Sequence, residues 1–346
     1  MISLRRCSMS TVSDPVAASP VGRPVVGTMI GDPAGIGPEV AVKALASGLV
    51  HEVSIPVLLG STGAVERAIQ MTGANVRVRT MRQFETPSDD PRVIDIIDTG
   101  ALPNGILPLG EDTEIAGRAT ALWLDELDAL ARDGSFAATI MGPISTGSLK
   151  MAGKLDKVIS PIPGESYLVL LTGPLRVAHL TDHMSLRQVI DVITADLVDK
   201  AIGQVNDAMR SWGIASPRIA VAGLNPHAVG DEERLEIAPG VERARARGIA
   251  VEGPIAPDSV FRQCIEGRYD MVLAMCHDQG HIAVKTWGFS GNCVIMMGPP
   301  YLHMSVAHGT AYDIVGTGKA DASMMLSAMR TCGQLAAGQG FEREAK

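Results

Sequence analysis

The chain has 346 residues and a formal net charge of −8, and 46% of its residues are hydrophobic, which is enough for two domains with sizeable cores. No apolar stretch approaches the roughly 20 residues that cross a bilayer, and no basic tract interleaved with aromatic residues is present. Neither a membrane nor a nucleic acid is therefore an expected partner. Five scattered cysteines without a CxxC pair indicate a reducing compartment. We expect a cytoplasmic protein whose residues 1–24, which lack the apolar core of a secretory signal, form a disordered tail.

Apolar runs that end at glycine or polar turns alternate with helical patterns along the chain. Amphipathic helices are predicted at 117–134 and 195–213. This alternation is typical of α/β proteins with largely parallel sheets, in which ligands bind beyond the carboxyl ends of the strands. Strands are predicted within the segments 23–30, 54–60, 137–145, 176–183, 218–227 and 270–279.

The first predicted strand leads into the sequence GDPAGIG at 31–37. This stretch lacks the Lys-Ser/Thr ending of a P-loop, and it does not fit the GxGxxG pattern. Pro38 suits the first position of a following helix, and Glu39 complements the helix N-terminus. Although such an N-terminus could face an anion, we interpret the segment as a structural turn.

Histidines at the ends of three predicted strands are the most informative feature of the sequence. His183, His227 and His277 each follow an apolar run, where parallel strands would present side chains at one edge of a sheet. Imidazole is the commonest transition-metal ligand near neutral pH, and three converging imidazoles leave positions open for a substrate. The pattern favours a metal site; the alternative is three separate turn histidines. His179, inside an apolar run, is expected to be a buried, hydrogen-bonded core residue, whereas we predict no role for His281.

A second candidate site is the sequence VAHGTAYDIVGTGKAD at 306–321. Its glycines would let the backbone pass close to a nucleotide. Asp313 could accept hydrogen bonds from both adenosine ribose hydroxyls, and its charge would repel a 2′-phosphate, which favours NAD over NADP. A glycine-rich structural loop is the alternative. The cofactor-binding candidates are His308, Gly309, Asp313, Gly316 and Gly318.

Five motifs together resemble the 4-hydroxythreonine-4-phosphate dehydrogenase family, which shares the wider fold of isocitrate and isopropylmalate dehydrogenases. They are IGDPAGIGPE, LNPHA, PDSVF, MCHDQGHIAVK and HGTAYDIVGTGKA, and they lie in the family's order between about residues 25 and 335. The resemblance implies two α/β/α domains with largely parallel sheets and an active-site cleft between them. The first, cofactor-side domain would comprise 25–143 and about 292–340. The second, with the metal ligands and the dimer contacts, would comprise about 144–291.

The resemblance also implies an activity and a homodimer with a shared active site. His183 and His227 of one subunit and His277 of the other would hold a divalent metal. The sequence does not distinguish zinc, cobalt, manganese, nickel and magnesium. With NAD against the loop 308–318, the family oxidises a small β-hydroxy acid, and the β-keto product loses carbon dioxide.

Three side chains are the catalytic candidates. By the resemblance, Lys285 matches a substrate-binding lysine, and Asp258 matches an acidic residue contributed across the dimer. Asp278, which follows a candidate metal ligand directly, is the third.

Several positions at which the family binds its phosphorylated substrate differ in this chain. By the resemblance, Glu165 and Ser166 replace a histidine and a threonine, Val294 replaces an asparagine, and His303 replaces an arginine. The change removes cationic anchors, and arginine is the preferred bidentate partner of phosphate and carboxylate. The substrate-binding candidates are Glu165, Ser166, Lys285 and His303.

The sequence therefore leaves the substrate open. The family default is 4-phosphohydroxy-L-threonine, and the altered pocket favours a different β-hydroxy acid. A four-carbon sugar-acid phosphate, such as threonate or erythronate 4-phosphate, and a carboxylated cyclic dihydrodiol are the alternatives. Two alternatives are not dehydrogenases: a phosphate acyltransferase of the same broad fold, and a metabolite-binding protein without catalytic activity. The strand-end histidines and the Asp313 loop argue against the first, and the retained histidines with Lys285 argue against the second.

Overall fold

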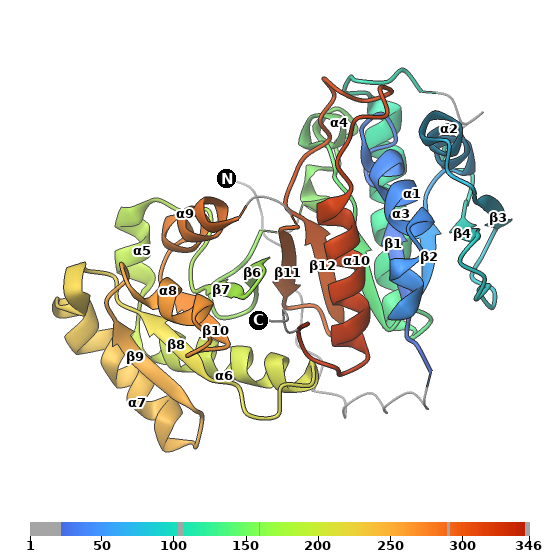
Figure 1. Ribbon diagram of the computed structural model, residues 1–346. Helices are drawn as coiled ribbons and strands as arrows, with labels where there is room; N and C mark the ends of the chain where they lie inside the picture. Colours follow the sequence, from blue (N-terminus) through green and yellow to red (C-terminus); the bar gives the residue numbers. More distant parts are fainter. Residues whose placement is uncertain (1–21, 103–106, 159, 289–290, 343–346) are drawn as a thin grey trace.

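The computed structural model describes residues 22–102, 107–158, 160–288 and 291–342. Most of the expected N-terminal tail, residues 1–21, lies outside the described residues. The strands are β1 (Val25–Met29), β2 (Ile55–Leu59), β3 (Arg77–Met81), β4 (Val93–Ile97), β5 (Ala138–Met141), β6 (Tyr167–Thr172), β7 (Leu175–His179), β8 (Ile219–Ala222), β9 (Val251–Ile255), β10 (Met271–Ala274), β11 (Cys293–Met297) and β12 (Leu302–Val306). They form one sheet in the order β3-β4-β2-β1-β5-β12-β11-β6-β7-β10-β8-β9 (Figure 1).

Antiparallel strands join two parallel parts of this sheet. Strands β3, β4, β2, β1, β5 and β12 pair in parallel, and β7, β10, β8 and β9 form a second parallel set. Between the sets, β11 and β6 run antiparallel to all their neighbours. The expected α/β class with largely parallel strands is confirmed, and the structure joins both parallel sets in a continuous sheet. The exact division into two domains stays a prediction.

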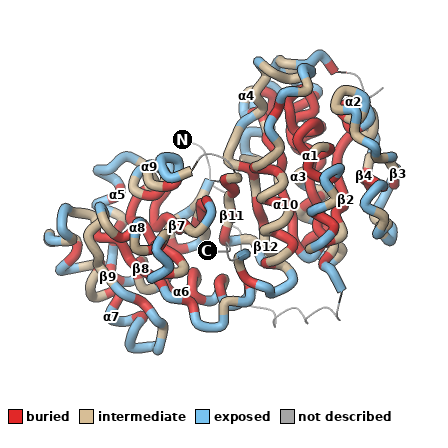
Figure 2. Tube along the Cα trace, viewed as in Figure 1, coloured by how far each residue is buried: buried red, intermediate tan, exposed pale blue. Residues whose placement is uncertain are grey.

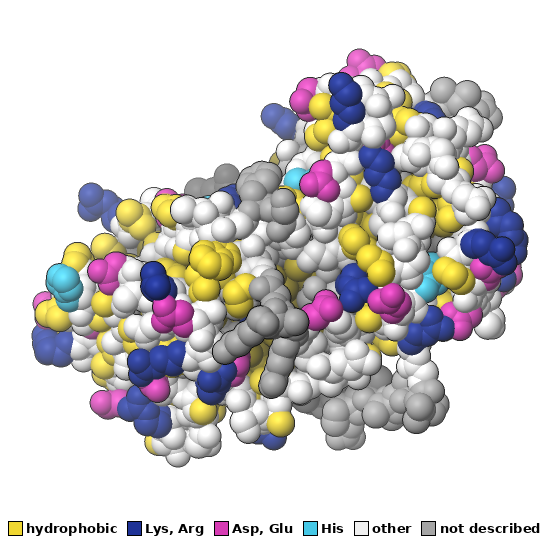
Figure 3. Space-filling model, viewed as in Figure 1, with side chains coloured by type: hydrophobic (Ala, Val, Ile, Leu, Met, Phe, Trp, Pro, Cys, Tyr) yellow, Lys and Arg dark blue, Asp and Glu magenta, His cyan; other side chains and the backbone are white. Residues whose placement is uncertain are grey.

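Ten helices of the described residues cover the sheet, whose central strands are the most buried part of the molecule (Figure 2). Helix α10 packs on β12 and β5, and α9 packs on β7 and β6. The helices are α1 (Gly37–Ala46), α2 (Thr62–Thr72), α3 (Glu114–Arg132), α4 (Thr146–Met151), α5 (Leu186–Val192), α6 (Ala195–Ser211), α7 (Ala238–Ala246), α8 (Val260–Ile265), α9 (His277–Trp287) and α10 (Ser323–Ala336). Acidic and basic side chains are interspersed over the visible surface (Figure 3). Within the described ranges, no helix has the length and apolar content that a bilayer crossing requires.

The six predicted strand segments overlap β1, β2, β5, β7, β8 and β10. The helices predicted at 117–134 and 195–213 overlap α3 and α6, and the helix expected to begin at Pro38 is α1. The remaining strands lie outside the predicted segments. Strand β3, for example, is largely exposed and polar, so it lacks the buried apolar run on which the prediction relied.

Half of the ten helices named above begin with a side-chain cap, and α9, which carries part of the site, is among those that do not. Serine or threonine hydroxyls cap α2, α3, α4, α5 and α6 by accepting backbone N–H bonds. Helix α9 has no such cap at Cys276. Instead, the side-chain oxygen of Gln279 accepts a hydrogen bond from the backbone N–H of Met275 at 2.9 Å. This contact fixes the start of α9, where His277 lies.

Two helix glycines provide a test of close packing. A Cβ added at Gly117 in α3 would lie 2.0 Å from the backbone oxygen of Ser148 in α4, whereas one at Gly203 in α6 would be 3.4 Å from the flexible end of Arg247. We expect Gly117→Ala to lower the free energy of unfolding by about 1–3 kcal/mol, because backbone must move to accommodate the methyl group. Gly203→Ala is the matched control and should be neutral or stabilising by up to about 1 kcal/mol. Equal stability of both variants in urea denaturation would contradict the close approach of α3 and α4.

Candidate active site

The ends of two neighbouring strands bring candidate metal ligands together. Strands β7 and β10 are parallel, with Ala274 opposite His179, so the segments that follow them leave the sheet at the same edge. The segment after β7 carries Asp182 and His183, and His277 begins α9 after β10. The ring centroids of His183 and His277 are 5.0 Å apart. One ligand atom from each of Asp182, His183 and His277 lies within 4.8 Å of the other two, a spacing that one metal ion could bridge.

The three side chains of this group differ in burial and in hydrogen bonding. Asp182 is 3% exposed, and neither of its carboxylate oxygens accepts a hydrogen bond from the described residues. Its closest partner is the exposed His183, whose Nδ1 lies 3.1 Å from Oδ1. Nδ1 of His277 is 2.7 Å from Oδ1 of Asp278. A carboxylate partner favours the proton on Nδ1, which leaves the Nε2 lone pair of His277 available to a metal.

Two further histidines lie behind this group. His281 stacks on His277 with ring centroids 3.6 Å apart and planes 17° apart, and its ring is 5.1 Å from that of His179. Buried His179 shares a hydrogen bond through Nδ1 with the carbonyl of Leu168 in β6, which confirms the expected core role. Burial lowers the pKa of His179 to about 4 and that of His281 to about 3, so both rings are neutral at neutral pH. We predicted no role for His281, although its spacing of four residues from His277 could have placed the two on one helix face.

The third predicted metal ligand, His227, is outside this group. It is exposed in the loop after β8, with a left-handed backbone at φ 58° and ψ 13°. The loop is tied to α9, because Nε2 of Gln279 donates to the carbonyl of Gly223 at 2.9 Å. In the described part of the chain, only His183 and His277 of the predicted trio converge, and they do so within one chain, whereas the resemblance placed them on different subunits. A metal contact by His227 stays a prediction.

Helix α9 also positions Lys285. His277, His281 and Lys285 follow one another at four-residue intervals and so share one side of the helix. Burial is the main cause of the low pKa of His281, and the neighbouring imidazoles come next. The charge of the exposed Lys285 lowers this pKa further. The lysine therefore lies near the histidine group. Asp258 is exposed in the connection between β9 and α8, and its catalytic role stays a prediction.

Two substrate candidates precede β6. Glu165 is exposed, and Oγ of Ser166 accepts a hydrogen bond from the backbone N–H of Ile162 at 2.8 Å. Because Leu168 in β6 contacts the ring of His179, both candidates lie at the sheet edge that carries the histidine group.

His303 is placed differently from our expectation of a substrate anchor. It is 8% exposed within β12, and its Nδ1 lies 2.8 Å from Oγ1 of Thr139 in the adjacent β5. His303 and Thr139 are opposite each other in the paired strands, so the ring lies on one face of the sheet, and burial lowers its pKa to about 4. Val294, another substituted position, lies in β11. A direct contact of His303 with substrate stays a prediction.

The buried ring of His303 makes stability depend on pH. In the folded chain the ring stays neutral down to about pH 4, whereas the unfolded ring takes up a proton below its ordinary pKa of 6.5. Stability should therefore fall as the pH drops from about 6.5 toward 4, by at most about 1.4 kcal/mol per pH unit for this group. We expect His303→Gln to flatten that slope in denaturation experiments with chelator present. His227→Gln, at an exposed position, is the control, and an unchanged slope in His303→Gln would contradict the assignment.

The candidate cofactor loop, residues 308–318, packs on the elements that follow β1. The backbone N–H of Ile36 donates to the carbonyl of Thr310 at 3.0 Å. Nζ of Lys43 in α1 donates to the carbonyl of Gly318 at 2.8 Å. Both ends of the loop are therefore held by the first βα unit of the chain.

The loop combines a buried, unpartnered imidazole nitrogen with backbone and a carboxylate that are exposed. Nδ1 of His308 is 2.8 Å from the carbonyl oxygen of Gly309, while its buried Nε2 has no hydrogen-bond partner among the described residues. A Cβ at Gly309 would meet no atom within 4 Å, so the backbone there borders open space. Asp313 is exposed, and Gly316 has a φ of 79°, which favours glycine.

Tyr312 ties the loop to two carboxylates that the sequence analysis did not single out. Its Oη lies 3.0 Å from Oδ1 of Asp112 and 3.3 Å from Oδ2 of Asp32. Oδ1 of Asp32 accepts the backbone N–H of Ala34 at 2.8 Å. Burial raises the pKa of Asp32, whereas the hydrogen bond from Ser145 lowers that of Asp112. The GDPAGIG turn, interpreted as structural, thus also anchors the candidate cofactor loop.

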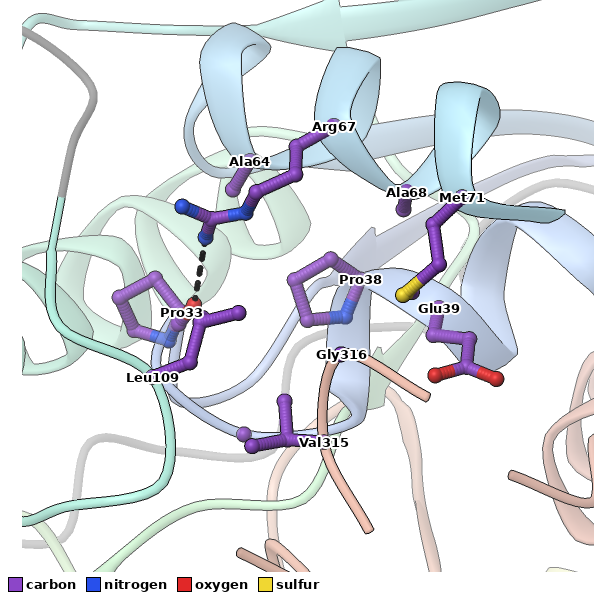
Figure 4. A pocket seen from close by; sticks show the side chains of 11 residues that line it. Pro33, Pro38, Glu39, Ala64, Arg67, Ala68, Met71, Leu109, Val315 and Gly316 are labelled. Atoms are coloured by element: carbon purple, nitrogen blue, oxygen red, sulfur yellow. Dashed lines mark hydrogen bonds between the residues drawn. The ribbon is translucent and has the colours of Figure 1, made fainter. Parts of the chain in front are cut away.

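A hollow lies between α2 and this loop (Figure 4). Arg67 and Met71 project toward it from α2, and Val315 and Gly316 border it from the loop. Nη2 of Arg67 donates to the carbonyl of Pro33 at 3.3 Å. No sequence pattern had indicated Arg67, because its place depends on packing between segments far apart in the chain.

Comparisons with known sequences cover nearly the whole chain. The family described as pyridoxal phosphate biosynthetic protein PdxA matches residues 52–332. A protein of Novosphingobium aromaticivorans, provisionally named 4-hydroxythreonine-4-phosphate dehydrogenase, is 82% identical over 97% of this chain and 100% of its own length. A protein of Symbiobacterium thermophilum, provisionally named D-threonate 4-phosphate dehydrogenase, is 38% identical over 91% of this chain and 97% of its own length.

Solved structures share the architecture. A 4-hydroxythreonine-4-phosphate dehydrogenase from Burkholderia phymatum has a TM-score of 0.79 at 34% identity, over 91% of this chain and 98% of its own. A terephthalate 1,2-cis-dihydrodiol dehydrogenase from Burkholderia xenovorans has a TM-score of 0.65 at 29% identity, over 92% of this chain and 99% of its own.

Proposed function

Because the chain belongs to the family of the pyridoxal phosphate biosynthetic protein PdxA, we propose that it is an NAD- and divalent-metal-dependent dehydrogenase. The relatives are named dehydrogenases, so the chain is an oxidoreductase acting on a CH–OH group. The proposed reaction is oxidation, followed by decarboxylation, of a small β-hydroxy acid. The observation that carries the proposal is the convergence of His183 and His277 beside the buried carboxylate of Asp182. We further propose a cytoplasmic homodimer with a shared active site.

The residues at the ends of β7 and β10 fit a divalent metal. Imidazole nitrogens of His183 and His277 lie close together, and the neighbouring carboxylate of Asp182 has no hydrogen-bond donor within the described chain to offset its charge. His183 and His277 would hold the ion, and His227 is a further candidate. A bound divalent metal acts as a Lewis acid on a substrate oxygen. Zinc, cobalt, manganese, nickel and magnesium all remain compatible with these donors.

The loop 308–318 fits NAD. The open backbone at Gly309 would let a nucleotide approach closely, and the nearby Nε2 of His308 is buried without a hydrogen-bond partner among the described residues. The exposed carboxylate of Asp313 would accept hydrogen bonds from ribose hydroxyls and repel a 2′-phosphate. Bound NAD accepts the hydride, while the protein supplies position and electrostatics.

The side chains along α9 have separate roles in the proposed reaction. Asp278 holds Nδ1 of His277 and so fixes the ring that would face the metal. Lys285, on the same side of the helix, would bind the substrate carboxylate or assist proton transfer. Asp258 would reach the site from the partner subunit.

The residues at the substituted substrate positions indicate which substrate the chain would accept. Glu165 is an exposed carboxylate near the histidine group, so it would repel a substrate phosphate, and the buried His303 is neutral at neutral pH. Relatives are named for 4-hydroxythreonine 4-phosphate, for D-threonate 4-phosphate and for a terephthalate dihydrodiol. The family default is 4-phosphohydroxy-L-threonine, with threonate or erythronate 4-phosphate as an alternative. The loss of cationic anchors favours a carboxylated substrate without phosphate, such as a cyclic dihydrodiol.

A substrate panel tests this proposal. Phosphorylated and unphosphorylated β-hydroxy acids should be incubated with NAD, while NADH and carbon dioxide are measured in parallel. We expect turnover of at least one acid, a loss of about 100-fold or more on chelation, and recovery on addition of a divalent metal. His277→Ala should show the same loss without recovery, because a ligand is missing. Turnover that neither chelator nor this substitution affects would refute the metal-dependent mechanism.

Asp313 provides a separate test of the cofactor site. Asp313→Asn should lower the ratio of kcat/KM with NAD to kcat/KM with NADP, and Asp313→Arg should lower it further, by about 10-fold to 100-fold in total. The physical reason is stepwise removal of the charge that would repel a 2′-phosphate. An unchanged ratio in both variants would show that the loop does not contact the ribose.

A further inference from the structure

The middle of the candidate cofactor loop has an unfavourable backbone conformation. Ala311 has a φ of 44°, in the left-handed range that a residue with a Cβ adopts only where its surroundings hold it there. Such strain clusters at active sites and in ligand-binding segments. Tyr312 follows directly, and Asp313, the candidate partner of the adenosine ribose, comes next. The contacts that hold this conformation therefore also determine where the carboxylate of Asp313 lies.

The two ends of the loop are held without the help of Tyr312. The backbone N–H of Ile36 donates to the carbonyl of Thr310 at 3.0 Å. At the other end, Nζ of Lys43 donates to the carbonyl of Gly318 at 2.8 Å. Loss of a contact in the middle of the loop would therefore leave both ends in place.

The hydroxyl of Tyr312 connects the middle of the loop to two carboxylates outside it. Oη lies 3.0 Å from Oδ1 of Asp112 and 3.3 Å from Oδ2 of Asp32. Asp32 is itself held by the backbone N–H of Ala34 at 2.8 Å. Asp112 accepts a hydrogen bond from the hydroxyl of Ser145, the residue that caps α4. Because both acceptors are fixed by other elements of the fold, the hydroxyl ties the loop to a rigid support.

We propose that Tyr312 is a positioning residue of the candidate cofactor site, which acts by holding the carboxylate of Asp313 toward the ribose. The inference rests on the NAD dependence proposed above and adds a residue that works through its neighbour. Asp313 is exposed, so its place relies on the backbone at Tyr312. A carboxylate held in one place accepts hydrogen bonds from both ribose hydroxyls and repels a 2′-phosphate, whereas a mobile one does both less well.

Fluorescence titration of the full-length chain with NADH and with NADPH tests this role. In Tyr312→Phe, which keeps the ring and removes the hydroxyl, the Kd of NADH should rise by about 3-fold to 10-fold, as the loss of one hydrogen bond implies. The Kd of NADPH should rise by less than about twofold, because a displaced carboxylate also repels the 2′-phosphate less. The ratio of the two constants is the decisive quantity, since a general loosening of the loop would weaken both complexes alike.

A second variant tests whether Tyr312 acts through its neighbour. In an Asp313→Ala background, Tyr312→Phe should change the Kd of NADH by less than about twofold, because the carboxylate that it positions is gone. An undiminished effect in this background would overturn the positioning role. The melting temperature of Tyr312→Phe should stay within about 4 °C of the unaltered chain. A larger fall would assign the hydroxyl to overall stability and overturn the role as well.

Tyr269→Phe is the matched control. The hydroxyl of Tyr269 donates to Oε2 of Glu252 at 2.7 Å, beside β9 at the far edge of the sheet from the loop. This variant loses a comparable bond and should keep both constants within about twofold. An unchanged Kd of NADH in Tyr312→Phe, or equal increases for both nucleotides, would overturn the role of Tyr312 and leave the NAD-dependent function standing. Absence of NADH binding to the unaltered chain would instead overturn the proposed NAD dependence and this inference with it.

Discussion

The parallel pairing of β7 with β10 is the contact on which the candidate active site depends. The pairing continues beyond the strand ends, because the backbone N–H of Leu180 donates to the carbonyl of Ala274 at 2.8 Å, and the Thr181 hydroxyl donates to the carbonyl of Met275. These bonds hold the segment that carries His183 beside the start of α9. Because side chains alternate along a strand, a slip of one residue would turn the ligands to opposite faces.

The same sheet relates the histidine group to the candidate cofactor loop. Strand β6 contacts His179 and pairs with β11, β11 pairs with β12, and β12 ends just before residues 308–318. The three antiparallel pairings from β12 to β7 would put the ends of these two strands at opposite edges of a flat sheet. A twist of about 20–25° at each of these pairings turns β7 away from a direction strictly opposite to that of β12. Figure 1 shows α9 at the upper end of its half and the connection from β12 to α10 at the upper end of the other, so both candidate sites lie toward one side of the molecule.

Local patterns predicted those parts of the site that depend on a single strand end. His183 and His277 follow apolar runs that form β7 and β10, so their shared edge follows from strand direction alone. His227 follows β8 in the same way, but a left-handed turn, which no apolar pattern encodes, determines where its ring lies. His303 was assigned through family resemblance while β12 was absent from the predicted strands, so its burial between β5 and β11 could not be foreseen. The sequence analysis did not predict Asp182 as a site residue for another reason. The burial of its carboxylate without a hydrogen-bond donor results from the folded environment and not from a local pattern.

Two buried aspartates, Asp32 and Asp182, differ in the hydrogen-bond donors that surround them. Asp32 is fully buried, yet its oxygens meet the backbone N–H of Ala34 and the hydroxyl of Tyr312, and burial raises its pKa. The protein itself thus satisfies this carboxyl group, which serves to anchor the candidate cofactor loop. Asp182 is buried to a similar degree beside two imidazoles, but no described group donates to it. The two acids therefore differ in their surroundings: Asp32 has internal donors, whereas Asp182 lies beside the histidine group with no donor among the described residues.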